Sequence, residues 1–83
     1  MTFKKSTFLI TKPQISYIEI LAVDLCLSRR QRNGVISMEL DRKIEYLDEM
    51  TKDEGSRIIE YLKRLKEDNN IKEAALAEME SRD

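Results

Sequence analysis

Residues able to perform acid–base, nucleophilic or metal chemistry are few in this chain of 83 residues. Histidine, the commonest metal ligand and proton shuttle, is absent, and Cys26 is the single cysteine. Cys26 falls on a predicted apolar helix face, where a cysteine usually packs as a small hydrophobic residue. The carboxylates of Asp41 and Glu45 form an i, i+4 pair but lack the Glu-x-x-His pattern of carboxylate metal sites. We therefore expect no enzyme, no metal site and no cofactor.

A second group of chemically capable residues is basic. The stretch "SRRQRN" places Arg29, Arg30 and Arg32 on one short turn, beside Gln31 and Asn33. Arginine binds phosphates, and arginine, glutamine and asparagine also contact base edges. The chain as a whole has a net charge of −1, whereas nucleic-acid-binding domains are typically basic. The three arginines therefore predict a weak contact with nucleic acid.

The composition is typical of one small domain with an apolar core. Hydrophobic residues make up 41% of the chain and charged residues 37%, which is too apolar for a disordered chain. A chain of this size buries only about 60–65% of its unfolded surface, so oligomerisation is one way to gain stability. The apolar run "FLI" is too short for a signal peptide or a membrane span. We expect a cytoplasmic protein with no membrane contact.

Three capping boxes mark where helices begin. In a capping box, a serine or threonine and a glutamine or glutamate three residues later each accept a hydrogen bond from a backbone N–H of the first turn. The three boxes are Thr11 with Gln14, Ser28 with Gln31, and Thr51 with Glu54. They predict helices over about residues 12–27 and 52–68, and a short helical turn after Ser28. Asn33 and Gly34 are expected to stop that turn, since both tolerate a left-handed conformation.

The remaining segments complete an all-α fold of three to four helices. Apolar spacing predicts a short helix over about residues 38–46. The opening "TFKKSTF" is either a loose arm or a short strand that pairs with "GVISM", and an arm is favoured. We therefore divide the chain into an N-terminal arm (1–11), a helical domain (12–68) and a C-terminal segment (69–83). Gly55, early in the predicted helix over 52–68, is expected to permit a close approach to the first helix.

The first predicted helix is apolar on two sides. A broad face holds seven apolar residues: Ile15, Tyr17, Ile18, Leu21, Ala22, Leu25 and Cys26. Ile20, Val23 and Leu27 form a second stripe on the opposite side. A helix of this kind in a soluble chain is either central to its fold or half covered by another chain. Two interpretations stay open: the C-terminal segment folds over the stripe, or the stripe binds a protein partner, most simply a second copy.

The C-terminal segment also allows two interpretations. After "EDNN" the sequence "IKEAALAEMESRD" has high helix propensity and predicts a separate or frayed helix. Alternatively, a 4-3 spacing from Ile58 to Met79 lets one long helix continue through, with Asn69 at a coiled-coil seam.

Two stretches carry a resemblance to a known family. "ITKPQISYIEILAVDLCLS" and "LDEMTKDEGSRIIEYLKRL" resemble a small helical module of phage and prophage proteins, often found beside single-strand annealing or recombination domains. The module's pattern runs from I-T-x-x-Q through an apolar helix to L-T-x-E-A-S-x-L-I-x-x-L. The resemblance covers residues 9–66 and rests on ten positions: Thr11, Gln14, Leu21, Leu25, Leu27, Thr51, Glu54, Ser56, Ile59 and Leu62. Gly55 stands where the module usually has alanine.

The resemblance implies an adaptor in phage-type DNA metabolism. Such an adaptor would be a non-enzymatic protein-interaction module, with Ile20, Val23 and Leu27 as the partner-binding residues. Two alternatives remain: a nucleic-acid-binding accessory protein that uses the arginine turn, and a small phage-encoded inhibitor of a host protein. A nucleic-acid-binding protein would lose affinity steeply with salt, whereas an interaction module would bind through its apolar stripe.

Overall fold

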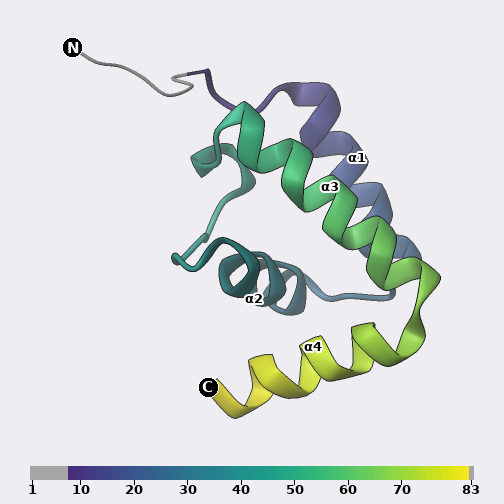
Figure 1. Cartoon of the computed structure of the whole chain (residues 1–83). Coiled ribbons are helices and arrows are strands. Elements are labelled where there is room, and N and C mark those ends of the chain that lie inside the picture. Colours follow the sequence, from purple (N-terminus) through teal and green to yellow (C-terminus); the bar gives the residue numbers. More distant parts are fainter. Residues whose placement is uncertain (1–7, 83) are drawn as a thin grey trace.

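The computed structural model describes residues 8–82 and consists of four α-helices joined by short connections (Figure 1). The helices are α1 (Lys12–Asp24), α2 (Arg29–Leu40), α3 (Lys52–Glu67) and α4 (Asn69–Arg82), with a short 3₁₀ helix, η1 (Leu47–Glu49), before α3. Within the described residues there is no strand, only an isolated bridge between Leu9 and Thr51. The predicted all-α class is confirmed.

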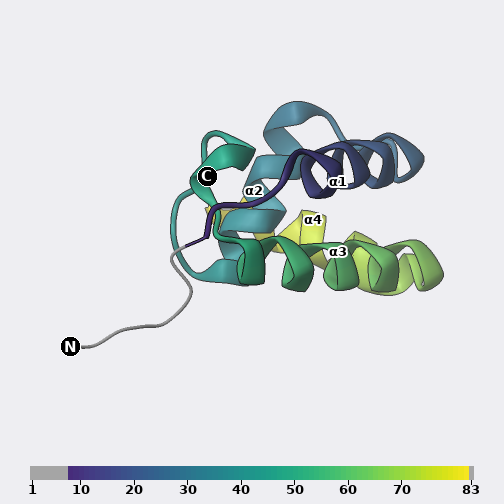
Figure 2. The same ribbon diagram turned by 90° about the horizontal axis from the view of Figure 1, so that it is seen from above.

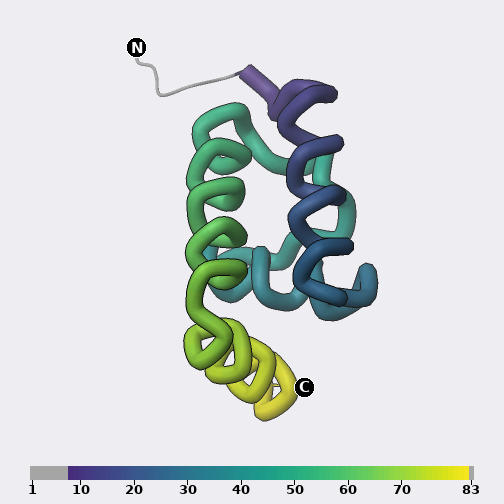
Figure 3. Tube along the Cα trace, turned by 90° about the vertical axis from the view of Figure 1, so that its right-hand side faces the viewer, coloured from purple at the N-terminus to yellow at the C-terminus, as the bar shows by residue number. Residues whose placement is uncertain are grey.

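Helices α1 and α3 lie side by side and run in the same direction, as Figures 2 and 3 show from two sides. Helix α2 and the loop through η1 bring the chain back to the end at which α1 begins (Figure 1). The bridge fixes that shared end, because the Ile10 N–H donates to the Met50 carbonyl at 3.0 Å and the Lys52 N–H donates to the Phe8 carbonyl at 2.9 Å. The two helices therefore start next to each other.

The N-terminal predictions are resolved in part. Residues 1–7, most of the predicted arm, lie outside the described part of the chain. The alternative strand pairing with "GVISM" is wrong, because residues 34–38 are helical in α2. The segment that does pair with the end of the arm is residues 50–52.

Helix α1 ends earlier than predicted, at Asp24. Cys26 has a left-handed φ of 61°, and the N–H groups of Cys26 and Leu27 donate to the carbonyls of Val23 and Ala22 at 2.9 Å each. This is the Schellman arrangement that closes a helix, and it usually carries a glycine at the left-handed position. Cys26 is exposed, so the prediction that it packs on the apolar face is wrong.

Helix α2 continues through the two residues expected to stop it. Gly34 is helical, and a Cβ added to it would collide with the Sδ of Met79 in α4. The glycine therefore serves the close packing of α4 and does not end the helix. The left-handed residue that caps α2 is Asp41, with a φ of 55°. Because α2 extends to Leu40, the predicted helix over 38–46 is wrong.

Residues 41–46 form an irregular loop whose polar groups are bonded to α2. The Ser37 hydroxyl accepts a hydrogen bond from the Ile44 N–H at 2.8 Å and donates to the Asn33 carbonyl at 2.8 Å. The Asn33 amide donates to the Glu45 carbonyl at 2.8 Å. These bonds hold the loop against α2 and direct Ile44 into the core, where it is 2% exposed.

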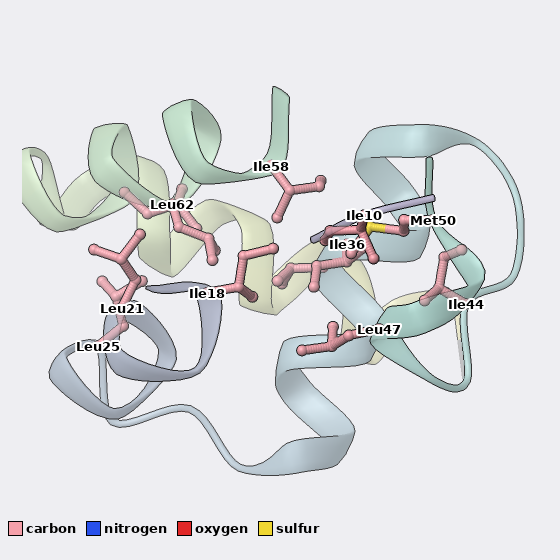
Figure 4. Packing of buried hydrophobic residues seen from close by; sticks show 12 residues of the cluster. Ile10, Ile18, Leu21, Leu25, Ile36, Ile44, Leu47, Met50, Ile58 and Leu62 are labelled. Carbon is pink, nitrogen blue, oxygen red and sulfur yellow. The ribbon is translucent and has the colours of Figure 1, made fainter. Parts of the chain in front are cut away.

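The core lies between α1 and α3 and extends toward α2 and η1 (Figure 4). Figure 4 shows Ile18 and Leu21 of α1, and Leu25 directly after it, facing the side of Ile58 and Leu62 of α3. The remaining buried members of this core are Ile10, Val35, Ile36, Ile44, Leu47, Met50 and Leu65. Gly55 admits Ile10 and Gln14, whose side chains would lie 2.8 Å and 3.2 Å from an added Cβ. The predicted close approach to the first helix is therefore present.

Helix α4 is separate from α3. Asp68 leaves the helical conformation, with φ −132° and ψ 101°, and its carboxylate accepts a hydrogen bond from the Asn70 N–H at 3.0 Å. Helix α4 packs against α2 and α3 and buries Met79. The prediction of a separate C-terminal helix is confirmed, and one long third helix is excluded.

Candidate interaction surface

The hydrogen bonds of Gln14 position α1. The Thr11 hydroxyl accepts from the Gln14 N–H at 3.2 Å, and the Thr11 N–H donates to Gln14 Oε1 at 3.0 Å, which completes the predicted capping box. The Gln14 amide also donates to the Lys52 carbonyl at 3.1 Å and to the Ser56 hydroxyl at 3.2 Å. One side chain therefore caps α1 and fastens it to the first turn of α3.

This attachment leaves opposite sides of α1 in different environments. On the inner side, Ile18 and Leu21 are 0% and 3% exposed. On the outer side, Ile20 and Val23 are 58% and 74% exposed, and Tyr17, predicted to lie inward, is 42% exposed. Single exposed apolar residues are common, whereas several neighbouring ones on one helix face are typical of an interaction site.

We define the outer α1 face as Ser16, Tyr17, Ile20 and Val23. A shallow hollow of about 400 Å³ lies on this face, lined by five residues: Ser16, Glu19, Ile20, Val23 and Asp24. The first four have the spacing i, i+3, i+4, i+7, which is the set that forms a hole for a side chain of a facing helix. The small Ser16 leaves room in this hole. Such a hole can receive one side chain of a packed helix.

One of the three residues in the predicted partner-binding stripe, Leu27, does not lie with the other two. Leu27 is half-buried and packs against the core, because the Schellman turn carries it off the line of α1. Ile20 and Val23 remain exposed. The suggestion that the C-terminal segment covers the stripe is wrong, because α4 packs against α2 and α3 instead.

Charged residues lie at both ends of the outer α1 face, and the exposed Glu19 lines the hollow between them. Lys12, at the start of α1, is exposed. At the other end the Lys66 ammonium lies 2.9 Å from the Asp24 carboxylate, and both side chains are about half exposed. The face therefore has a positive beginning and a carboxylate at its end.

The three arginines of the predicted nucleic-acid turn have different neighbours. The Arg29 guanidinium lies over the Tyr46 ring, 5.8 Å from its centroid, and the Arg30 guanidinium lies 3.9 Å from the Glu80 carboxylate. Arg32 is half-buried, and its burial lowers the pKa of its guanidinium while the charge of Glu19 opposes that shift. Arg29 lines one shallow cleft together with Arg32 and another together with Arg30.

An exposed aromatic residue beside this turn was missed by the sequence analysis. Tyr46 is 56% exposed and lies between two shallow clefts of about 360 and 460 Å³, both of which Arg29 also lines. The predicted helix over 38–46 concealed it, because a helical Tyr46 would have belonged to an ordinary solvated face. The signal available in the sequence was a tyrosine flanked by charged residues in "RKIEYLDE".

Neither a metal site nor a membrane span occurs among the described residues. In residues 8–82, no three His, Cys, Asp or Glu side chains come together in a group that could hold a metal ion. The helices of the same range are too short or too polar to cross a membrane. Every buried side-chain nitrogen and oxygen in this range has a hydrogen-bond partner, so no unpaired polar atom marks a ligand site.

Comparison of the chain with models of protein families, with curated proteins and with solved structures found no match.

Proposed function

We propose that this chain is a non-enzymatic protein-interaction module that binds its partner through the outer α1 face. The observation that carries the proposal is the exposure of Ile20 and Val23, 58% and 74%, on the helix that also supplies Ile18 and Leu21 to the core. Fully burying one such aliphatic side chain contributes about 1.5–3 kcal/mol, so covering the exposed parts of both is worth roughly 2–4 kcal/mol. A partner that covers this face therefore gains substantial free energy.

The biological setting is proposed from the resemblance alone. A module of phage-type recombination proteins would act as an adaptor in DNA metabolism, and a phage-encoded inhibitor of a host protein would use the same surface with another partner. Both settings predict a protein ligand for the outer α1 face, and they differ in the identity of that ligand.

Capture with matched variants tests the proposed surface. The immobilised chain is incubated with a lysate of a candidate host, and retained proteins are compared between the parent, Val23→Glu and Ala77→Glu. Ala77 is exposed on α4, so its replacement adds the same charge to a different helix. We expect a protein retained by the parent and by Ala77→Glu to be lost with Val23→Glu. Equal retention by all three folded proteins would contradict the proposal.

A second candidate function is favoured by Tyr46. An exposed aromatic ring flanked by arginine is the arrangement on which single-stranded nucleic acids stack their bases, and each stacked base contributes about 1–3 kcal/mol. Arg29 lies over Tyr46, and Lys43 and Arg30 line the larger neighbouring cleft. Acidic groups weaken this surface, because Glu45 lies 3.3 Å from Lys43 and Glu80 lies near Arg30. We therefore place it behind the protein-interaction function.

Binding of a labelled single-stranded oligonucleotide separates the two candidates. The nucleic-acid function predicts measurable binding that weakens as salt is raised and falls about tenfold with Tyr46→Ala. Binding should be unchanged by Val23→Glu, which lies on another face. If no binding is measured at low salt, the second candidate is excluded and the outer α1 face remains the proposed site.

A further inference from the structure

We propose that the outer α1 face binds a second copy of this chain, with the two α1 helices packed antiparallel about a two-fold axis at the height of Ile18. The inference rests on the proposed function, because it names the occupant of the same surface. Symmetric pairing of a patch with its own copy is the commonest form of assembly among soluble proteins. It also suits a small domain, for which association compensates for a limited core.

The shape of the outer α1 face is complementary to itself. In an antiparallel pair centred on Ile18, residues equally distant from that centre lie opposite each other. Ser16 and Ile20 are each two residues from the centre, so the Ile20 side chain of one copy faces Ser16 of the other. Ser16 lies at the N-terminal end of the hollow of about 400 Å³, so the exposed Ile20 of the second copy enters the hollow at that end. Both copies make this contact, because the axis exchanges them.

The outer parts of the face pair in the same way. Pro13 and Val23 are each five residues from Ile18, so an exposed apolar side chain of one copy meets one of the other. Helical packing of this kind inserts side chains of one helix into holes of the next. The apolar contact therefore extends along the length of α1 on both sides of the axis.

Charge complementarity selects the antiparallel direction. Lys12 and Asp24 are each six residues from Ile18, so antiparallel packing brings Lys12 of one copy to Asp24 of the other, twice per dimer. Parallel packing would instead bring the two Lys12 ammonium groups together, which is unfavourable. Asp24 already lies 2.9 Å from Lys66 of its own chain, and Lys12 of the second copy would complete a group of three alternating charges.

The size of the contact predicts a weak dimer. Helix α1 has 13 residues and a length of about 20 Å at about 1.5 Å per residue. A standard stable interface buries about 800 Å² per partner, and one face of such a helix buries less. We therefore expect dissociation constants in the micromolar to millimolar range, with monomers and dimers both present at accessible concentrations.

Sedimentation equilibrium of the purified chain from about 10 μM to about 1 mM tests this proposal, because that range brackets weak association. The parent and Ala77→Glu should show a monomer–dimer equilibrium. Ile20→Glu places a charge in the hollow, and Ser16→Lys fills the hollow from an exposed position without touching the core. Both variants should sediment as folded monomers, with circular dichroism confirming the fold.

Charge reversal tests the direction of packing. Lys12→Asp and Asp24→Lys should each weaken the dimer about tenfold, whereas the double variant should regain most of the parental affinity. If Asp24→Lys acted only by breaking its own ion pair with Lys66, changing Lys12 as well would not restore the affinity. If the parent stays monomeric to about 1 mM, a second copy is not the partner of the outer α1 face. The capture experiment tests separately whether this face binds another protein. A dimer retained by Ser16→Lys, or a double variant no better than the single ones, overturns the proposed geometry.

Discussion

Glu54 connects two parts of the molecule through one carboxylate. It accepts a hydrogen bond from the Thr51 N–H at 3.0 Å as part of the capping box of α3. The Arg42 guanidinium donates to both carboxylate oxygens, at 2.7 and 3.1 Å, and also to the Glu49 carbonyl at 3.1 Å. The start of α3 is thereby fastened to the loop that follows α2.

This arrangement makes stability depend on pH. The hydrogen bond from Arg42 is the largest cause that lowers the pKa of Glu54; partial burial opposes it, and the Thr51 N–H adds to the lowering. Because the folded state binds the proton less readily than the unfolded chain, the stabilisation is present above the ordinary glutamate pKa of 4.5 and is lost as the pH falls below it.

We expect the unfolding free energy of the parent to fall between about pH 6 and about pH 3, and to fall less in Glu54→Gln, which cannot lose a carboxylate. Urea denaturation at the two pH values measures the difference. Glu73→Gln, which removes an exposed carboxylate of α4, is the matched control and should follow the parent. If Glu54→Gln showed the same pH dependence as the parent, the pairing of Glu54 with Arg42 would not contribute to the pH dependence of stability.

Cys26 offers a second test at the residue scale. A non-glycine residue in the left-handed region costs about 1–2 kcal/mol, part of which a glycine recovers through its freedom from steric conflict. We expect Cys26→Gly to raise the unfolding free energy by about 0.5–1 kcal/mol, measured by thermal or urea unfolding under reducing conditions. A loss of stability would mean that the cysteine side chain makes a contribution that its exposed position does not explain.

At the scale of one element, the apolar residues of α1 fall into a buried set in the core and an exposed set on the outer α1 face. Leu21→Ala removes a side chain that is 3% exposed and should cost about 2–5 kcal/mol. Ile20→Ala, one residue away and 58% exposed, should change the unfolding free energy by less than about 0.5 kcal/mol in the monomer. Urea unfolding at low concentration compares the two. Equal costs would mean that the outer α1 face is part of the core.

Helix α4 depends on one close contact. Met79 is 5% exposed and occupies the space that a side chain at Gly34 would need. We expect Met79→Ala to cost about 2–5 kcal/mol and to increase amide exchange along α4 before the rest of the domain. In Gly34→Ala/Met79→Ala, the added methyl group enters the vacated space, so the double variant should be more stable than the sum of the single effects by about 0.5–3 kcal/mol. Simple additivity would contradict the contact.

The elements differ in how far the sequence predicts them, and the difference follows the distance of the interactions involved. The three helix starts were predicted because each capping box lies within four consecutive residues. Gly34 was misinterpreted because its partner, Met79, lies in another helix. The end of α1 was misplaced because Cys26 adopts a conformation that its type does not indicate.

At the scale of the whole molecule, the packing of α4 determines which surface is free. The sequence identified Ile20 and Val23 as a second apolar stripe but could not say what covers it, because that depends on the direction in which the chain turns at Asp68. Since α4 turns toward α2 and α3, the outer α1 face stays exposed (Figure 1). Tyr46 is a candidate binding residue because the loop over 41–46 leaves its side chain exposed, which the sequence does not indicate.

The central claim is that the outer α1 face binds a second copy of the chain, and amide chemical shifts recorded across a dilution series test it most directly. We predict that the shifts that change with concentration cluster at Ser16, Tyr17, Ile20 and Val23, and that those of α4 stay constant. Spectra that do not change with concentration, or changes centred on Tyr46 and Arg29, would contradict self-association through this face.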